Sequence, residues 1–354
     1  MKLFKYPYLV QNEILNNTEF SDLLMFSFVS KRMKKLIESS SQMQRFGNVK
    51  TIRYDHRNGR TFVCIPFHHY HDHMLQIAEL DDTQNDYFQL NVSEKMINFR
   101  IVYEDNKYCP VAYYQPNECE SVLNSVHDYF HIFFGNSVEY YWFAHDYTKP
   151  IPQLQNLSAC IDMPTEQWLD MQRFEHFISL CPILKFIDID ILNVTAHMSP
   201  DSKFFQAEHI KMLLFEPTLP ANLLNFQGRQ AFVDCMRCSS RELIEFVNKW
   251  KSGEAFDKLE LMKIKSFRDL AQNEILEAIE AKYFDSAKEP PAHILPKVYR
   301  DIAFDEQPNT DPITSYTYVV RETDSRVASV LIHDKTFNFG VWDKTEDEFL
   351  RIME

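Results

Sequence analysis

Scarcity of glycine restricts most strongly what this chain can fold into. The sequence contains six glycines, and the two closest, Gly47 and Gly59, lie 12 positions apart. Dinucleotide-binding loops, phosphate-binding loops, kinase glycine loops and the nucleophile elbow of α/β-hydrolases each need two or more glycines within about eight residues. The sequence therefore excludes these classes of nucleotide-dependent enzyme and hydrolase.

Composition and charge narrow the choice of partner. Of the 354 residues, 45% are hydrophobic and 25% charged, which is typical of a globular protein. The net charge of −14 opposes a nucleic-acid partner, because binding phosphates requires clustered Lys and Arg. No apolar run approaches the 18 residues of a membrane-spanning helix, and the early polar residue Gln11 interrupts any signal-peptide core. We expect neither membrane insertion nor export.

The cysteines point to a reducing compartment. There are seven, an odd number spread thinly along the chain. We expect free thiols and a location in the cytosol, the nucleus or both. The pair Cys235 and Cys238 has CxxC spacing, but no second pair completes a tetrahedral zinc site, so we interpret both as buried thiols.

The first 40 residues predict three short helices that cannot enclose their own apolar surface. Pro7 suits the first turn of one helix, Ser21 and Asp22 suit the start of a second, and a third carries Lys31 to Lys35 on its polar side. Nineteen of these 40 residues are apolar. Domains of about 40 residues rarely hold a self-sufficient core. Either the rest of the chain or another protein must cover the surplus.

Four short motifs in this segment resemble the F-box, in the form found in the large nematode F-box families. They are Tyr6-Pro7, Glu13-Ile14-Leu15, Asp22-Leu23-Leu24 and Val29-Ser30-Lys31-Arg32. The resemblance implies that the helices dock on a Skp-family adaptor, which links them to a cullin-based SCF-type E3 ubiquitin ligase. The adaptor-binding anchors that we predict are Pro7, Ile14, Leu15, Leu23, Leu24 and Val29. The alternative is an ordinary small helical bundle with Lys31 to Lys35 facing solvent.

The remainder of the chain predicts an α/β fold with flanking β-hairpins. Asn58-Gly59 between two strand-like runs is a strong hairpin signal. From about 136 to 285, strand-like stretches recur with midpoints 19 to 28 residues apart, close to the spacing of leucine-rich repeats. A β-meander is expected at about 313–343. We predict an F-box at 1–45 and a leucine-rich-repeat-like α/β domain at 46–354, with a plain α/β sandwich as the alternative.

Two further motifs resemble the F-box-associated type 2 domain. One is Phe246-Val247-Asn248-Lys249-Trp250-Lys251 followed by Leu259-Glu260, and the other is the ending Val327-Ala328-Ser329-Val330 with Phe339-Gly340-Val341-Trp342. This resemblance implies a non-catalytic domain that recognises a protein substrate. It implies no cofactor, and we predict no catalytic residue. A variant of this hypothesis is a scaffold that binds the adaptor without a role in ubiquitin transfer.

Two polar motifs are candidate chemical sites. His68-His69-Tyr70-His71-Asp72-His73 suggests a metal-dependent hydrolase, since histidines two apart on a strand share a face, but it matches no metallo-hydrolase pattern in either register. We expect a solvated or partner-facing cluster and no bound metal. Asp188 and Asp190 alternate with isoleucines, which predicts that both face outward from a strand as weak substrate-binding residues.

Overall fold

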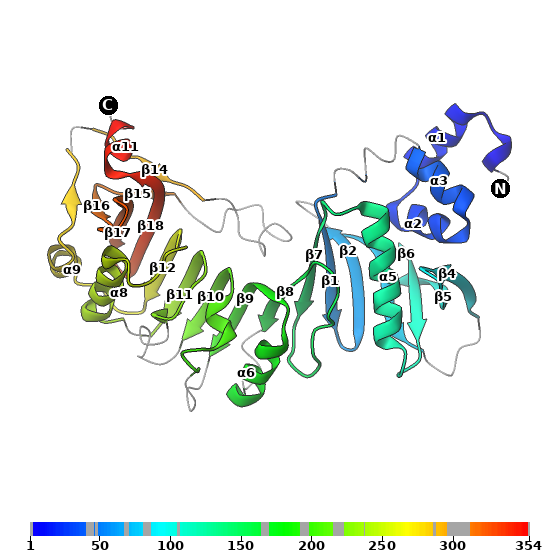
Figure 1. Cartoon of the computed structure of the whole chain (residues 1–354), viewed down its shortest axis with the longest axis horizontal. Helices are drawn as coiled ribbons and strands as arrows, with labels where there is room; N and C mark the ends of the chain where they lie inside the picture. The colour runs from blue at the N-terminus through cyan, green and yellow to red at the C-terminus, as the bar shows by residue number, and fades with distance from the viewer. Residues whose placement is uncertain are drawn as a thin grey trace. The chain divides into compact units, whose positions relative to one another are not determined.

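The computed structural model describes residues 3–39, 46, 49–66, 71–80, 86–104, 107–163, 170–191, 198–214, 223–236, 238–285, 288–295 and 312–352. The chain is mixed α/β and divides into two compact units (Figure 1). The described parts of Met1–Ala144 and Ile151–Ser158 belong to unit 1, and those of His145–Pro150, Ala159–Asp301 and Asp305–Glu354 to unit 2. None of the described helices combines the length and apolarity needed to cross a membrane.

Unit 1 begins with the three predicted helices. After a short turn at Leu3–Lys5 (η1) come α1 (Tyr8–Asn16), α2 (Phe20–Val29) and α3 (Lys31–Ser39). Pro7 directly precedes α1, where its carbonyl accepts the amides of Val10 and Gln11 at 3.0 and 3.1 Å. Ser30 precedes α3, and its hydroxyl accepts the Met33 amide at 3.1 Å. Both residues satisfy helix ends, which explains the sharp turns between these short helices.

The rest of unit 1 consists of seven neighbouring strands and the helix α5 (Cys119–Phe134). In spatial order its strands are β7 (Glu139–Ala144), β1 (Thr51–Arg57), β2 (Arg60–Pro66), β3 (His71–Glu79), β6 (Lys107–Tyr114), β5 (Lys95–Glu104) and β4 (Phe88–Val92). β1 is parallel to β7 and β3 is parallel to β6, whereas the other described pairs are antiparallel.

The predicted hairpin is confirmed, with a backbone that explains its residues. Asn58 and Gly59 both have positive φ, 50° and 75°, between the paired residues Arg57 and Arg60. A two-residue turn with positive φ at both positions matches the right-handed twist of the flanking strands, and Asn-Gly is its favoured sequence.

Unit 2 contains a parallel ladder with crossover elements between its strands. β8 (Leu157–Met163), which belongs to unit 2 from Ala159 onward, is followed by β9 (Ile183–Ile191), β10 (His209–Leu214), β11 (Gln230–Cys235) and β12 (Leu261–Ser266). β9 to β12 pair in parallel and in chain order. The crossovers include α6 (Met171–Leu180), η2 (Lys203–Gln206) and α8 (Ser240–Ser252), which begins with the predicted capping box of Ser239 and Glu242.

The predicted meander extends this ladder. β16 (Thr317–Val320), β17 (Arg326–His333) and β18 (Thr336–Thr345) are antiparallel neighbours, and β18 pairs antiparallel with β12. The remaining described elements of this region are α9 (Gln272–Ala278), β13 (Lys282–Tyr283), β14 (Ala292–His293), β15 (Ile313–Thr314) and α11 (Glu346–Arg351). β14 and β15 form a separate two-stranded sheet.

Compact unit 1 contains more of the chain than the three helices. The three helices share a unit with β1 to β7, and β7, the first of the recurring strands, pairs with β1 of unit 1. Of the described strands of unit 1, β3 and β6 were not predicted. β3 begins with the polar residues His71-Asp72-His73, and β6 contains Pro110, which cannot donate a hydrogen bond to a neighbouring strand. The domain boundary at residue 45 stays a prediction.

Candidate functional site

Three of the predicted anchors form the core of the helical segment. Leu15, Leu23 and Leu24 have no solvent-exposed surface. A side chain enclosed by its own chain cannot contact a partner unless the helices rearrange, so we assign these three leucines to internal packing. Pro7 and Val29 are exposed and Ile14 is partly exposed, so these three remain available as anchors.

The exposed apolar side chains of the helical segment lie just before α1, in the first turn of α1 and along α2. The largest exposures are those of Leu9 at 79% and Val29 at 63%. We call this set the apolar helical surface; its members are Tyr6, Pro7, Tyr8, Leu9, Val10, Phe26 and Val29. α2 is apolar on nearly all sides and gives no periodic signal to separate core from surface, so the sequence did not identify Phe26 as exposed. Leu9, in the first turn of α1, was also not predicted.

The opposite side of α2 is fixed to the sheet of unit 1. Phe28 packs edge-on against Tyr129 of α5, with ring centroids 4.6 Å apart, and lies 5.8 Å from the ring of Phe99 in β5. The Tyr129 hydroxyl donates to Oγ of Ser27 at 2.8 Å, and the Lys34 ammonium lies 4.6 Å from the Tyr129 ring centroid. Burial raises the pKa of Tyr129 to about 12, so this hydroxyl stays protonated as a donor. The helices are therefore packed onto the sheet on one side and bare on the other.

The second predicted set, Asp188 and Asp190, lies on the face of the unit 2 ladder opposite α8. Phe246 of α8 packs on Phe339 at 5.2 Å, and Phe339 pairs with Met262, so residues of the alternate register face away from α8. We call these residues the polar face: Asp188, Asp190, Lys211, Asp234, Lys263 and Lys265. With three carboxylates and three ammonium groups it has balanced charge.

Asp188 differs from its predicted outward exposure. It is 8% exposed, and its carboxylate lies 3.3 Å from Nζ of Lys211 on the neighbouring strand. Asp190 is partly exposed; burial raises the pKa of its carboxyl, Lys211 opposes the shift, and Asp234 and Asp162 add to it. The pairing register puts Asp188 opposite Lys211, which no periodicity in a single strand predicts.

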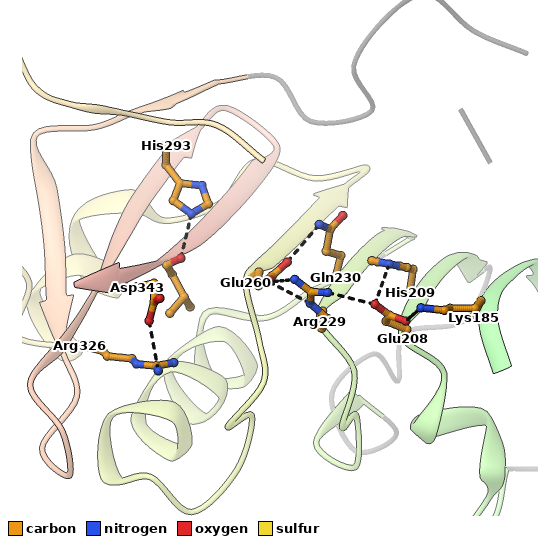
Figure 2. Close-up of polar contacts among 10 residues, drawn as sticks. Lys185, Glu208, His209, Arg229, Gln230, Glu260, His293, Arg326 and Asp343 are labelled. Carbon is orange, nitrogen blue, oxygen red and sulfur yellow. Dashed lines mark hydrogen bonds and ion pairs between the residues drawn. The ribbon is translucent and has the colours of Figure 1, made fainter. Parts of the chain in front are cut away.

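A row of alternating charges crosses the starts of β9 to β12, and the sequence analysis missed it (Figure 2). Glu208 bonds Lys185 on one side and Arg229 at 3.1 Å on the other, and the Arg229 Nε donates to Glu260 at 2.9 Å. We call Lys185, Glu208, Arg229 and Glu260 the charged ladder. Each lies directly at or beside the start of a parallel strand, so aligning the strands by register would have revealed it.

Burial lowers the pKa of two histidines of unit 2. Burial lowers the pKa of His209 to about 4 although Glu208 lies 3.7 Å from its Nε2. Burial also lowers the pKa of His293, whose Nε2 lies 2.9 Å from the carbonyl of Val341. Figure 2 shows the two rings on separate strands of unit 2. Neutral buried imidazoles of this kind contribute packing and hydrogen bonds rather than positive charge.

Most of the histidine cluster at residues 68–73 lies outside the part of the chain that the structure describes. Residues 67–70 are outside the described residues, as are the side chains of His71 and Asp72. His73 is exposed on β3, with its ring edge-on to Phe62 at 5.9 Å. Within the described part of the chain, no three His, Cys, Asp or Glu side chains converge as the ligands of a metal ion would.

A surface groove of about 780 Å³ lies beside α6 in unit 2. Its titratable lining residues include Asp170, Arg173 and His176. The Asp170 carboxylate accepts the backbone amides of Gln172 and Arg173 at 3.1 and 3.2 Å, and thereby caps α6. A carboxylate already committed to a helix end serves local structure, so this groove offers no arranged acid–base pair.

Comparison with known proteins gives one match. No curated protein and no solved structure matches the chain. The family model described as the F-box domain matches residues 7–44, the segment that contains α1, α2 and α3. The chain therefore contains an F-box domain, whose helices carry the apolar helical surface.

Proposed function

We propose that this protein is the substrate-recognition subunit of a cullin-based SCF-type E3 ubiquitin ligase. In this proposal the F-box docks on a Skp-family adaptor, and the rest of the chain binds the protein to be ubiquitinated. The observation that carries the proposal is the F-box match at residues 7–44. F-box domains generally bind Skp1-type adaptors, and the proteins that contain them are generally non-catalytic substrate receptors.

The apolar helical surface supports an adaptor-binding role. Leu9 and Val29 are large aliphatic side chains exposed by 79% and 63%, although Leu15, Leu23 and Leu24 beside them are fully enclosed. Groups of exposed apolar side chains are typical of protein-binding surfaces. An interface of standard size buries about 1,600 Å² in total, and a few anchors supply most of its energy.

The packing of α2 onto the sheet supports a receptor in which the docked adaptor and the body of unit 1 move together. Phe28, Tyr129 and Ser27 form this junction by ring packing and a hydrogen bond. A flexible linker would allow the two parts to reorient, whereas buried aromatic packing resists reorientation.

We further propose that residues 46–354 form an F-box-associated type 2 domain of the nematode-expanded kind, with leucine-rich-repeat-like character in the parallel ladder. In-register parallel strands separated by crossovers support this. The polar face would then contact the substrate through Asp190 and its neighbours. Balanced charges favour a protein partner over a polyanion. The free state of all seven cysteines supports a cytosolic or nuclear location.

Co-purification with a Skp-family adaptor tests the proposal. The double variant Leu9→Asp and Val29→Asp places two charges on the apolar helical surface without touching the core, so we expect adaptor affinity to fall by at least about 30-fold. Ile132→Asp is the matched control: Ile132 is also 68% exposed but lies on α5, so binding should be unchanged.

Three outcomes are informative. Wild-type affinity in the double variant would contradict docking through this surface. Loss of binding in the Ile132→Asp control as well would indicate a general loss of solubility rather than a specific contact. Adaptor binding without ubiquitin transfer to any bound protein, in a reconstituted ligase, would identify a scaffold. Leu24→Ala is unsuitable as a binding test, because emptying a fully buried site costs about 2–5 kcal/mol and unfolds the segment.

A further inference from the structure

β4 is the last strand in the row of strands of unit 1, and one of its edges is open. It pairs antiparallel with β5 on one side, and no described strand pairs with its other side. Its sequence, Phe-Gln-Leu-Asn-Val, contains neither a charged residue nor a proline. Natural sheets usually protect an open edge with Lys, Pro, a bulge or a very short strand, as β13 does with two residues that include Lys282. β4 therefore offers an unprotected edge of the kind that pairs with further strands.

The pairing register shows which backbone groups of β4 point outward. Val92 and Lys95 close a two-residue turn whose members both have positive φ, so they form a hydrogen-bonded pair. Hydrogen-bonded and non-bonded pairs alternate along an antiparallel ladder. Gln89 and Asn91 therefore stand opposite β5 at non-bonded positions, and their N–H and C=O groups point away from β5. No described residue bonds these outward groups.

The other side of β5 gives the same alternation independently. Glu104 and Lys107 pair across a two-residue connection, so every second residue of β5, counted back from Glu104 to Asn98, bonds β6. Pro110, which has no N–H, stands opposite β5 at a non-bonded position, as this alternation requires. Because Asn98 directs its backbone groups to β6, its neighbour Gln89 on β4 has no bond to β5 and faces outward.

One face of the open edge is apolar and incompletely covered. Phe88 pairs with Phe99, whose ring lies 5.8 Å from that of Phe28 in α2. Phe88 and, two positions further on, Leu90 therefore lie on the face that α2 covers. Phe88 is nevertheless 41% exposed, and Leu90 is partly exposed. A strand added to β4 would place alternate side chains over these two residues and the others on the opposite face.

The charges around the edge favour a basic occupant. Asp86 precedes β4 and Glu94 follows it; both are exposed, and neither forms an ion pair with a described residue. Lys95, beside Glu94, is already paired with Glu118 at 3.0 Å. A second copy of the chain, with its own net charge of −14, is repelled, and a five-residue edge about 17 Å long falls far short of the roughly 1,600 Å² of a stable interface.

We propose that the open edge of β4 binds an extended segment of another protein by strand addition, and that this segment carries apolar side chains at alternate positions and Lys or Arg at its ends. The outward backbone groups of β4 supply the hydrogen bonds, and its apolar face supplies the side-chain contact. Asp86 and Glu94 attract the basic ends. The site is separate from the apolar helical surface, so it stands or falls independently of adaptor binding.

A synthetic peptide tests the proposal on the unaltered full-length protein. Asp86 to Glu94 comprise nine positions, so the probe is the capped peptide Lys-Thr-Val-Thr-Val-Thr-Val-Thr-Lys, and calorimetry measures its affinity. Two versions are compared with it, one N-methylated on the two central threonines and one on two of the valines. Only alternate residues of an added strand direct their N–H groups at β4. One version should therefore bind at least about tenfold more weakly, and the other should bind as the parent peptide does.

The identity of the weakened version also gives the direction of the added strand. Loss with methylated threonines indicates an antiparallel strand, in which the residues that bond β4 do not lie over Phe88 and Leu90, and loss with methylated valines indicates a parallel strand. Equal affinities of the two versions, or no binding of the parent peptide at millimolar concentration, would overturn the proposal.

A variant at the edge provides a second test. Gln89→Pro removes an outward N–H group and no bond of the β4–β5 ladder, so peptide affinity should fall at least about fivefold. Gln89→Ala, which keeps the N–H group, is the matched control and should bind as the wild type does. Equal binding by the two variants would contradict strand addition. Unchanged melting temperature and adaptor binding in Gln89→Pro exclude misfolding, and the methylated peptides decide the question if this variant does not fold.

The charges and the identity of the occupant are tested last. Asp86→Asn combined with Glu94→Gln should weaken peptide binding about threefold, and the exposed Glu277→Gln in α9 is the control that should not. Equal affinities in these two proteins would overturn the assignment of basic ends. In sedimentation the wild type should be monomeric at the concentrations used. A dimer that excludes the peptide and that Gln89→Pro dissociates would identify a second copy as the occupant and overturn the proposal.

Discussion

The hydroxyl group of Tyr129 in α5 donates a hydrogen bond of 2.8 Å to Oγ of Ser27 in α2, at the contact between the F-box helices and α5. Ser27 in turn donates to the carbonyl of Leu24, so one short chain of hydrogen bonds connects α5 with the interior of the F-box. Both Tyr129 and Ser27 are buried. This junction makes the stability of the F-box depend on residues about 100 positions further along the chain.

Removing that hydroxyl should weaken the junction without altering the docking surface. In Tyr129→Phe the ring stays in place, and we expect the free energy of unfolding to fall by about 1 kcal/mol, the net contribution of a typical hydrogen bond. Urea denaturation measures the change. Tyr108→Phe is the control, because Tyr108 is 70% exposed and should change stability by about 0.5 kcal/mol or less. A similar loss in both variants would contradict the role assigned to the Tyr129 hydroxyl.

Gly340 is required by a close approach between β18 and β14. A Cβ atom at this position would lie 2.7 Å from Nδ1 of His293 and 3.0 Å from Cδ1 of Ile313. We therefore expect Gly340→Ala to destabilise unit 2 by about 1–3 kcal/mol, as overpacked sites do. Thermal or urea unfolding gives the value.

A double-mutant cycle identifies the cause of that loss. In a His293→Ala background the clash is largely removed, so Gly340→Ala should cost less than it does in the wild type. Additive effects within about 0.5 kcal/mol would show that His293 is not the obstructing group.

The charged ladder should depend on its central arginine. Arg229→Met removes the cation between Glu208 and Glu260 and leaves two carboxylates facing each other (Figure 2). The Arg229 side chain is 47% exposed, so solvent screening limits the expected loss of stability to about 1 kcal/mol. The loss should shrink as salt rises, because added ions screen the repulsion between the carboxylates.

Arg173→Met serves as the control for the ladder. Arg173 lies 3.7 Å from Asp170 and is 81% exposed, so its loss should have no measurable effect on unfolding by urea. If Arg173→Met and Arg229→Met destabilise the protein equally, the ladder contributes nothing beyond an isolated surface ion pair.

The acid stability of unit 2 should depend on Asp324. A hydrogen bond from Arg321 at 2.9 Å lowers the pKa of Asp324 below its ordinary 3.8, and the Arg326 amide adds to the effect. Because the folded pKa is the lower one, the stabilisation is fully present above about pH 4. It is lost as the pH falls through the folded pKa, since the unfolded state binds the proton first.

Asp324→Asn tests this pH dependence. The Asp324 side chain is exposed, so the contribution at neutral pH is expected to be at most about 1 kcal/mol after allowance for solvent screening. Urea unfolding at several pH values should show the variant less stable than wild type near neutrality and nearly equal to it in strong acid. A constant difference at all pH values would contradict the assignment of this carboxylate.

Local patterns in the sequence predicted many of the elements. Asn58-Gly59 identified the β1–β2 hairpin, and Ser239 with Glu242 identified the start of α8, because each signal depends on backbone conformations a few residues apart. Strand β3 was missed because polar histidines begin it and because one of its two hydrogen-bonding partners, β6, is separated from it in sequence by β4 and β5.

By itself, the sequence determined that the chain carries an F-box motif, where most of its strands and helices lie, and which loop-based enzyme classes it cannot join. Only the tertiary structure decided that Leu23 and Leu24 are enclosed whereas Leu9 and Val29 are exposed, and that Glu208 meets Arg229. Local signals arise from backbone geometry within a few residues. Burial and side-chain pairing depend on which distant segments pack together, and no short stretch of sequence encodes that packing.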